Sequence, residues 1–158
     1  MLIQDKLRAS SVKRWHIITT SRSQSLAEHS FNVAQISLAI LDEMRCGMRE
    51  YWGGKVAQIA LDHDLHEIIE GDAPSTTKPT KDWEGFFAGV LTPEMIVKTA
   101  DVLDAYVFLN DHKVGRHANQ AFGWMEEQYL SMLRHTPLQL TSAVESVENQ
   151  LVSGEFTI

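Results

Sequence analysis

Apolar residues recur every three or four positions along most of the chain, which is the period of an α-helix with one buried face. The clearest stretch follows Ser25 and contains four such residues: Leu26, Val33, Ile36 and Ile40. Ser25 and Glu28 have the spacing of a capping box, in which each side chain is expected to accept a hydrogen bond from the backbone N–H of the other residue. The pattern therefore predicts a helix from Ser25 to about Met44.

The same spacing predicts four further helices, at about 55–70, 92–109 and 118–134, with a last helix after Pro137. Gly71 is suited to end the first of these, because glycine adopts the backbone conformation that closes a helix. Thr92 and Pro93 are a helix N-cap followed by a first-position proline. Segment 71–82 is too rich in Pro, Thr and Gly to continue a helix, so we expect a loop there. No window alternates with period two, and the fold class expected is an all-α bundle.

Composition and charge limit the possible functions. The chain has 158 residues, 44% of them hydrophobic, which fits one globular domain over residues 1–158. Its net charge of −7 leaves no basic stripe for a polymeric nucleic acid, although a metal ion and a few local cations still allow a small anion to bind. No apolar run is long enough for a membrane span, and residues 1–15 lack the apolar region of a signal peptide. With the single cysteine, Cys46, these features favour a cytoplasmic protein.

A cluster of ionisable residues lies within the second predicted helix. His63 and Glu67 are four residues apart and Asp64 and Glu67 are three apart, so all three are neighbours on a helix. The apolar residues that flank them indicate a position near the core, where unpaired charges are costly and a bound cation offsets that cost. Imidazole and carboxylate suit a divalent transition metal such as Zn, Mn, Co or Fe.

Two residues on other predicted helices are candidates to complete the metal site. His29 lies in the first turn of its helix, and Asp101 lies among apolar residues that give a carboxylate no evident partner. Taken singly, each has an ordinary alternative: a capping or core histidine for His29, and an ion pair with Lys98 for Asp101. The ordered set of His29, His63-Asp64 and Asp101 on three helices carries the hypothesis.

This set resembles the ligand pattern of the HD-domain superfamily, an all-α fold of metal-dependent phosphohydrolases. More closely, the chain is similar to the 5'-deoxynucleotidases of the YfbR type, over residues 13–106, in Arg14-Trp15 and in the motifs SLAEHSFNVA, HDLHEIIEGDAPSTTK and KTADVLDAY. The segment KRWHI and the compact C-terminal part also resemble the phage dATP triphosphohydrolases. The resemblance implies a single HD-domain helical bundle that acts on a small deoxynucleotide as a homo-oligomer, in the bacterial host cytoplasm if a phage encodes it.

The resemblance also implies catalytic roles for two acidic residues. Glu67 would orient or deprotonate the attacking water, and Asp72 would assist proton transfer to the leaving oxygen or hold a second divalent cation such as Mg. The ordinary alternatives are a surface carboxylate for Glu67 and a turn residue for Asp72.

Four residues are implied to contact the substrate. Arg14 would bind phosphate, and Trp15 would face the sugar and exclude a ribose 2'-hydroxyl. Ile17 would line the base, and Lys78 in the loop would meet the phosphate chain. Core packing for Trp15 and Ile17, and a solvated position for Arg14 and Lys78, are the alternatives.

The ligand set leaves two reactions open: release of phosphate from a deoxynucleoside monophosphate, or of triphosphate from a deoxynucleoside triphosphate, dATP above all. Three cations near the loop favour the triphosphate: Arg22, Lys78 and Lys81. A phosphodiesterase or alarmone hydrolase ranks lower, because the chain has no Gly-Tyr-Pro companion motif. A non-catalytic helical module that binds a nucleotide is the alternative from another class of protein.

Overall fold

The computed structural model describes residues 1–44, 47–72 and 80–153. Over these residues the chain forms helices, and its only strand-like pairings are two isolated bridges, Lys13–Ser25 and Thr20–Lys113. The helices are α1 (Ile3–Lys6), the 3₁₀ helix η1 (Leu7–Ser11), α2 (Leu26–Glu43), α3 (Met48–Asp62), α4 (Glu67–Glu70), α5 (Trp83–Phe86), α6 (Pro93–His112), α7 (Gly115–His135) and α8 (Leu138–Val152). The prediction of an all-α fold is confirmed.

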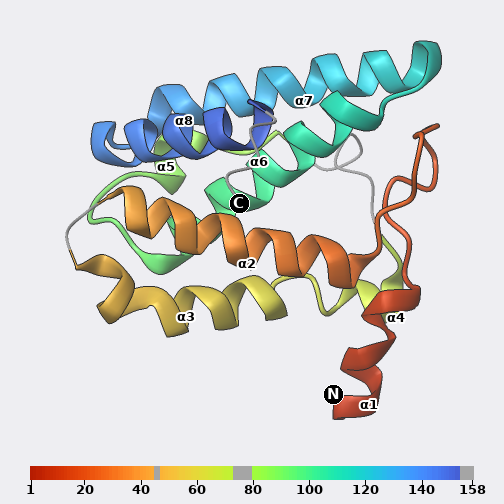
Figure 1. Ribbon diagram of the computed structural model, residues 1–158, viewed down its shortest axis with the longest axis horizontal. Helices are drawn as coiled ribbons and strands as arrows, with labels where there is room; N and C mark the ends of the chain where they lie inside the picture. Colours follow the sequence, from red (N-terminus) through yellow and green to blue (C-terminus); the bar gives the residue numbers. More distant parts are fainter. Residues whose placement is uncertain (45–46, 73–79, 154–158) are drawn as a thin grey trace.

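Helix α2 lies at the centre of the bundle and packs against α3, α6 and α8 (Figure 1). Helix α6 lies between α2 and α7 and also contacts α3 and α8. The short helix α1 projects from the body on the side where α4 lies (Figure 1). Among the described residues, no helix is both long enough and apolar enough to cross a membrane.

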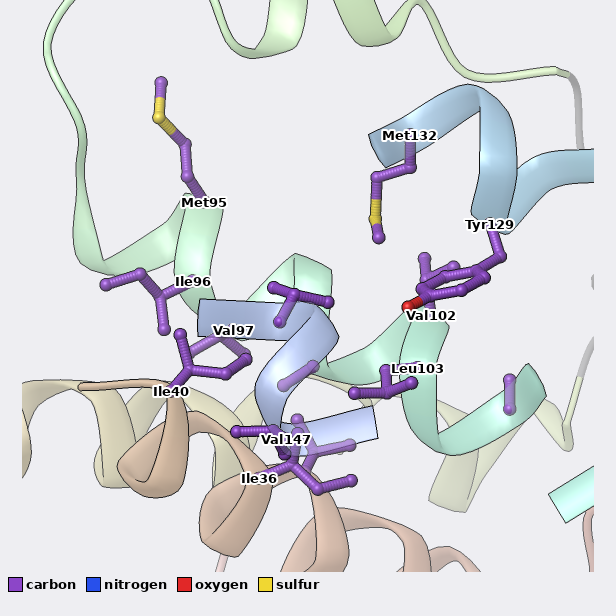
Figure 2. Close-up of a cluster of buried hydrophobic side chains, with 14 of the residues drawn as sticks. Ile36, Ile40, Met95, Ile96, Val97, Val102, Leu103, Tyr129, Met132 and Val147 are labelled. Atoms are coloured by element: carbon purple, nitrogen blue, oxygen red, sulfur yellow. The ribbon is translucent and has the colours of Figure 1, made fainter. Parts of the chain in front are cut away.

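The hydrophobic core fills the space between these helices (Figure 2). Ile40 of α2, Ile96 and Leu103 of α6, and Met132 of α7 are fully buried, and Val147 of α8 packs with them. Burying each such side chain stabilises the fold by about 1.5–3 kcal/mol. The core thus fixes α2 and α6 against each other, and these two helices carry candidate metal ligands.

The predicted helix starts agree with the structure where a capping side chain marked them. Ser25 Oγ accepts a hydrogen bond from the backbone N–H of Glu28 at 3.1 Å, and α2 begins at the next residue. Thr92 Oγ1 accepts from the backbone N–H of Met95 at 3.4 Å, with Pro93 as the first residue of α6. Both caps satisfy backbone donors that a helix N-terminus leaves without partners.

The prediction of one helix over 55–70 was wrong at both its start and its continuity. Helix α3 begins at Met48, and it includes Gly53 and Gly54, whose low helix propensity hid the earlier start. The helix ends at Asp62, and 63–66 form a turn before α4. In this turn the backbone N–H of Glu67 donates to the Asp64 carbonyl at 2.9 Å, a three-residue bond tighter than the α-helical one. Gly71, with φ of 81°, ends α4 as predicted.

Candidate metal centre

Four candidate ligands come together from three parts of the fold. His29 is on α2, His63 and Asp64 are in the turn after α3, and Asp101 is on α6. One ligand atom of each lies within 4.8 Å of the others. His29 Nε2 is 3.1 Å from Asp101 Oδ1, and His63 Nε2 is 3.2 Å from Asp64 Oδ2. Packing of α2, α3 and α6 thus converts a pattern spread over more than seventy positions into one compact set of donor atoms.

Both imidazole rings are oriented by hydrogen bonds on the side away from the cluster. His29 Nδ1 donates to Asp104 Oδ2 at 2.6 Å, and His63 Nδ1 donates to the Ala60 carbonyl at 2.7 Å. A carboxylate and a carbonyl only accept hydrogen bonds, so each Nδ1 carries a proton and each Nε2 is the atom turned toward the cluster. Both Nε2 atoms are buried without a hydrogen-bond partner. Two orphaned imidazole nitrogens that converge on two carboxylates fit a transition-metal ion.

Charges in the cluster shift the pKa values of His29, His63 and Asp101. Burial and Arg14 lower the pKa of His29, but Asp101, Asp104 and Asp64 outweigh them and raise that pKa to about 9. Burial lowers the pKa of His63, and Asp101 and Asp64 raise it to about 10. Burial raises the pKa of Asp101, whereas Lys98 and the two histidines bring it well below its usual range. Because a metal ion must displace protons from the imidazoles, metal binding at this site strengthens as the pH rises.

Asp104 is a further residue of the candidate site, which sequence reasoning missed. Besides His29, its carboxylate accepts hydrogen bonds from Gln24 Nε2 and Asn32 Nδ2, each at 3.0 Å. Asp104 thereby fixes the ring plane and the tautomer of His29. The available signal was a second aspartate in the apolar stretch of α6, three residues after Asp101 and therefore on the same face.

Replacing Asp104 with asparagine is expected to weaken metal binding by about 10- to 100-fold, because the ring of His29 loses the carboxylate that orients it. Competition against a chromophoric zinc chelator measures the affinity, and circular dichroism checks the fold. The variant Asn32→Ala removes only one contact of Asp104 and serves as the matched control, with a smaller loss expected. An Asp104→Asn protein with wild-type affinity would exclude this orienting role.

The two predicted catalytic carboxylates, Glu67 and Asp72, follow His63 and Asp64 in the chain and have different surroundings. Glu67 begins α4 and is only 2% exposed, directly after the turn that carries His63 and Asp64. Asp72 Oδ2 accepts a hydrogen bond from the backbone N–H of Trp15 at 3.2 Å, and its Oδ1 lies 3.8 Å from Arg14 Nε. Asp72 thus joins the segment after α4 to the N-terminal segment.

The predicted substrate contacts fall in different surroundings. Arg14 is buried, and its Nη1 donates to Gln24 Oε1 at 3.2 Å. Trp15 is buried too, and its ring stacks on Phe108 with the centroids 6.2 Å apart. Its φ of 60° places a bulky residue in the left-handed region, a strained conformation typical of functional positions. Ile17 is 58% exposed, and Lys78 lies outside the described residues.

A cavity of about 400 Å³ opens beside the cluster, between α3, α5, α6 and α7; we call it the α5–α7 cavity. His63, Asp64 and Asp101 line it together with Arg14, whereas Trp15 and Ile17 do not. Its apolar wall includes side chains that sequence reasoning did not assign to a site: Trp83, Phe86, Val97, Val102 and Trp124. Its further polar groups are Lys81, Glu94, Lys98 and Gln128.

Comparisons with known proteins agree with this arrangement. The model of the 5'-deoxynucleotidase YfbR-like family matches residues 5–83. A dATP triphosphohydrolase of Salmonella phage PMBT28 is 31% identical, over 91% of this chain and 84% of that relative. The chain belongs to the YfbR-like family.

Other relatives of this YfbR-like protein extend the likeness to the whole fold. A dATP triphosphohydrolase of Cyanophage S-2L is 30% identical, over 86% of this chain and 85% of that relative. A solved structure from Cyanophage S-2L, an HD phosphohydrolase (DatZ) bound to dA and one catalytic Zn²⁺ ion, superposes with a TM-score of 0.80. It is 23% identical and the match covers 97% of this chain and 98% of that one, so the two share the HD phosphohydrolase fold. The resemblance in the motifs is thereby confirmed.

Proposed function

We propose that this protein is a metal-dependent hydrolase of deoxynucleoside triphosphates, dATP foremost, that releases the deoxynucleoside and triphosphate. The observation that carries the proposal is the convergence of the two orphaned Nε2 atoms of His29 and His63 on Asp64 and Asp101. Two relatives that match more than four-fifths of the chain are dATP triphosphohydrolases. The cation proposed is Zn²⁺, the ion in the S-2L structure, with Co²⁺ or Mn²⁺ as alternatives that the same ligands accept.

In this proposal, His29, His63, Asp64 and Asp101 hold the cation. When bound, it supplies Lewis-acid activation of water and of the phosphoryl oxygen. Glu67 takes a proton as the water oxygen bonds to the α-phosphorus, and the bond from that phosphorus to the 5' oxygen breaks. Asp72 assists proton transfer to the 5' oxygen or holds a second cation such as Mg²⁺. The buried guanidinium of Arg14 offsets phosphate charge.

The test is to assay the purified protein with dATP and with dAMP and to identify the products by ion-exchange chromatography. We expect dATP to yield deoxyadenosine and triphosphate in equal amounts, with dAMP hydrolysed more slowly. Release of phosphate from dAMP with dATP untouched would instead make the protein a 5'-deoxynucleotidase. That second function is favoured by the match of residues 5–83 to the nucleotidase family model.

Three further expectations stay predictions: a single domain, a homo-oligomeric state and a location in the cytoplasm. The absence of polymeric nucleic acid among the partners is also a prediction, supported by the net charge of −7.

A further inference from the structure

The α5–α7 cavity contains cations that differ in how their charge is compensated. Arg14 lies 3.8 Å from Asp72 and 3.9 Å from Asp104, and Lys98 Nζ lies 2.5 Å from Asp101 Oδ2. Lys81 has no carboxylate partner among the residues that the structure describes. The cavity also contains the exposed Glu94, which forms no ion pair with Lys81. Among the described residues that line this cavity, Lys81 is therefore the cation without a carboxylate ion-pair partner.

Aromatic rings hold the Lys81 ammonium in place. Its Nζ lies 3.9 Å from the ring centroid of Phe86 and 5.8 Å from that of Trp83, which are cation–π distances. Burial and the positive charge of Lys98 lower the pKa of Lys81, against an opposing effect of Asp101. A held cation next to a second cation creates a local field that favours an anion, although the protein as a whole is acidic.

The arrangement indicates which part of a nucleotide enters the cavity. Trp15 and Ile17, the expected sugar and base contacts, do not line it, whereas His63, Asp64 and Asp101 do. We consider a nucleotide with its α-phosphate at these ligands and its sugar toward Trp15. Its remaining phosphates would extend into the cavity, toward Lys81 and Lys98.

Arg22, another cation near the loop, does not line the cavity. Arg22 Nη1 pairs with Glu28 Oε1 at 2.6 Å, and its Nε donates to His112 Nε2 at 3.1 Å. Lys78 lies outside the described residues. Of the two described cations near the loop, Arg22 and Lys81, Lys81 is the one that lines the cavity.

We infer that Lys81 binds the phosphates beyond the α-phosphate and so makes the site selective for triphosphates over monophosphates. The inference rests on the proposed function, because it requires a triphosphate substrate. It assigns Lys81 a role in substrate binding, separate from the residues that hold the metal and move protons.

The experiment compares steady-state kinetics of the Zn²⁺-loaded wild type with those of Lys81→Gln and Lys81→Arg, using dATP as substrate and dAMP as competitive inhibitor. For Lys81→Gln we expect the KM for dATP to rise about tenfold, as for loss of a charge-assisted contact, with kcat little changed. The inhibition constant of dAMP should stay the same, because dAMP lacks the distal phosphates. Lys81→Arg should retain most of the affinity for dATP.

Lys113→Gln is the matched control, because Lys113 Nζ lies 4.1 Å from the Phe122 ring centroid, outside the cavity. The inference would be overturned if the KM for dATP were unchanged in Lys81→Gln, or if it rose equally in Lys113→Gln. It would also be overturned if Lys81→Gln lost as much affinity for dAMP as for dATP, a result that would place the nucleoside in the cavity. A wild type that releases no triphosphate from dATP would overturn the proposed function and the inference with it. If the wild type releases triphosphate but has the same KM for dATP as Lys81→Gln, the inference alone is overturned and the proposed function stands.

Discussion

The substitution Asp101→Asn is expected to remove the bound metal and to lower kcat/KM for dATP by roughly 10³-fold or more, because a metal ion contributes several kcal/mol of transition-state stabilisation. The neutral amide is a weaker ligand, and it also leaves the Nζ of Lys98, 2.5 Å away, without its counter-charge. Metal content by mass spectrometry and triphosphate release from dATP measure the two effects.

The matched control for Asp101 is Asp111→Asn, the same change on the exposed face of the same helix. It should keep both the metal and the activity. If Asp101→Asn also kept one metal ion per chain and turned over normally, the ligand set of His29, His63, Asp64 and Asp101 would be wrong.

The substitution Glu67→Gln should separate metal binding from turnover. The amide has nearly the volume of the buried carboxylate but cannot accept a proton from water, so we expect kcat to fall by roughly 10²- to 10⁴-fold. Metal content should match the wild type, because Glu67 is not among the four clustered ligands. Rapid-quench assays with dATP give kcat, and metal analysis of the same samples gives the stoichiometry.

Glu70→Gln is the control for Glu67, since Glu70 is an exposed residue of the same short helix α4. Its activity should be that of the wild type. A fully active Glu67→Gln protein would refute the role of Glu67 in activating water. If the wild-type protein binds metal but hydrolyses no nucleotide, it would instead be the non-catalytic nucleotide-binding module.

Local signals in the sequence were sufficient for much of the fold. Ser25 and Thr92 each mark a helix start through a short-range hydrogen bond, and such bonds depend on residues three positions apart. The turn at 63–66 could not be predicted, because the apolar spacing continues through it and the tighter bond to Asp64 leaves no mark on composition. Tertiary packing also overrides the low helix propensity of Gly53, which is buried in α3.

The candidate site likewise contains residues that the sequence predicted and residues that only the fold reveals. His29, His63, Asp64 and Asp101 were predicted together because their order and residue types carry the pattern. Asp104 was missed because it is not part of that ligand pattern, and its hydrogen bond to His29, seventy-five positions away, forms only in the folded bundle. The α5–α7 cavity was missed because its wall combines Trp83 of α5 with Trp124 of α7, and only the folded bundle brings these together. The sequence also did not distinguish Lys81 from Arg22 as a candidate phosphate contact. In the structure Arg22 pairs with Glu28, whereas Lys81 lies against the ring of Phe86.

The unequal exposure of the four clustered side chains has a kinetic consequence. His29 is fully buried, whereas the side chains of His63, Asp64 and Asp101 are 14–16% exposed. The α5–α7 cavity, which His63, Asp64 and Asp101 line, would therefore be the route by which an ion held by this set exchanges with solution, and it is also the side proposed for the nucleotide. A nucleotide bound on that side would block the exit of the ion, and exchange of the metal with the solution would then occur in the interval between product release and the next substrate. The occupancy of the site during steady turnover would in this way depend on substrate concentration as well as on the supply of metal.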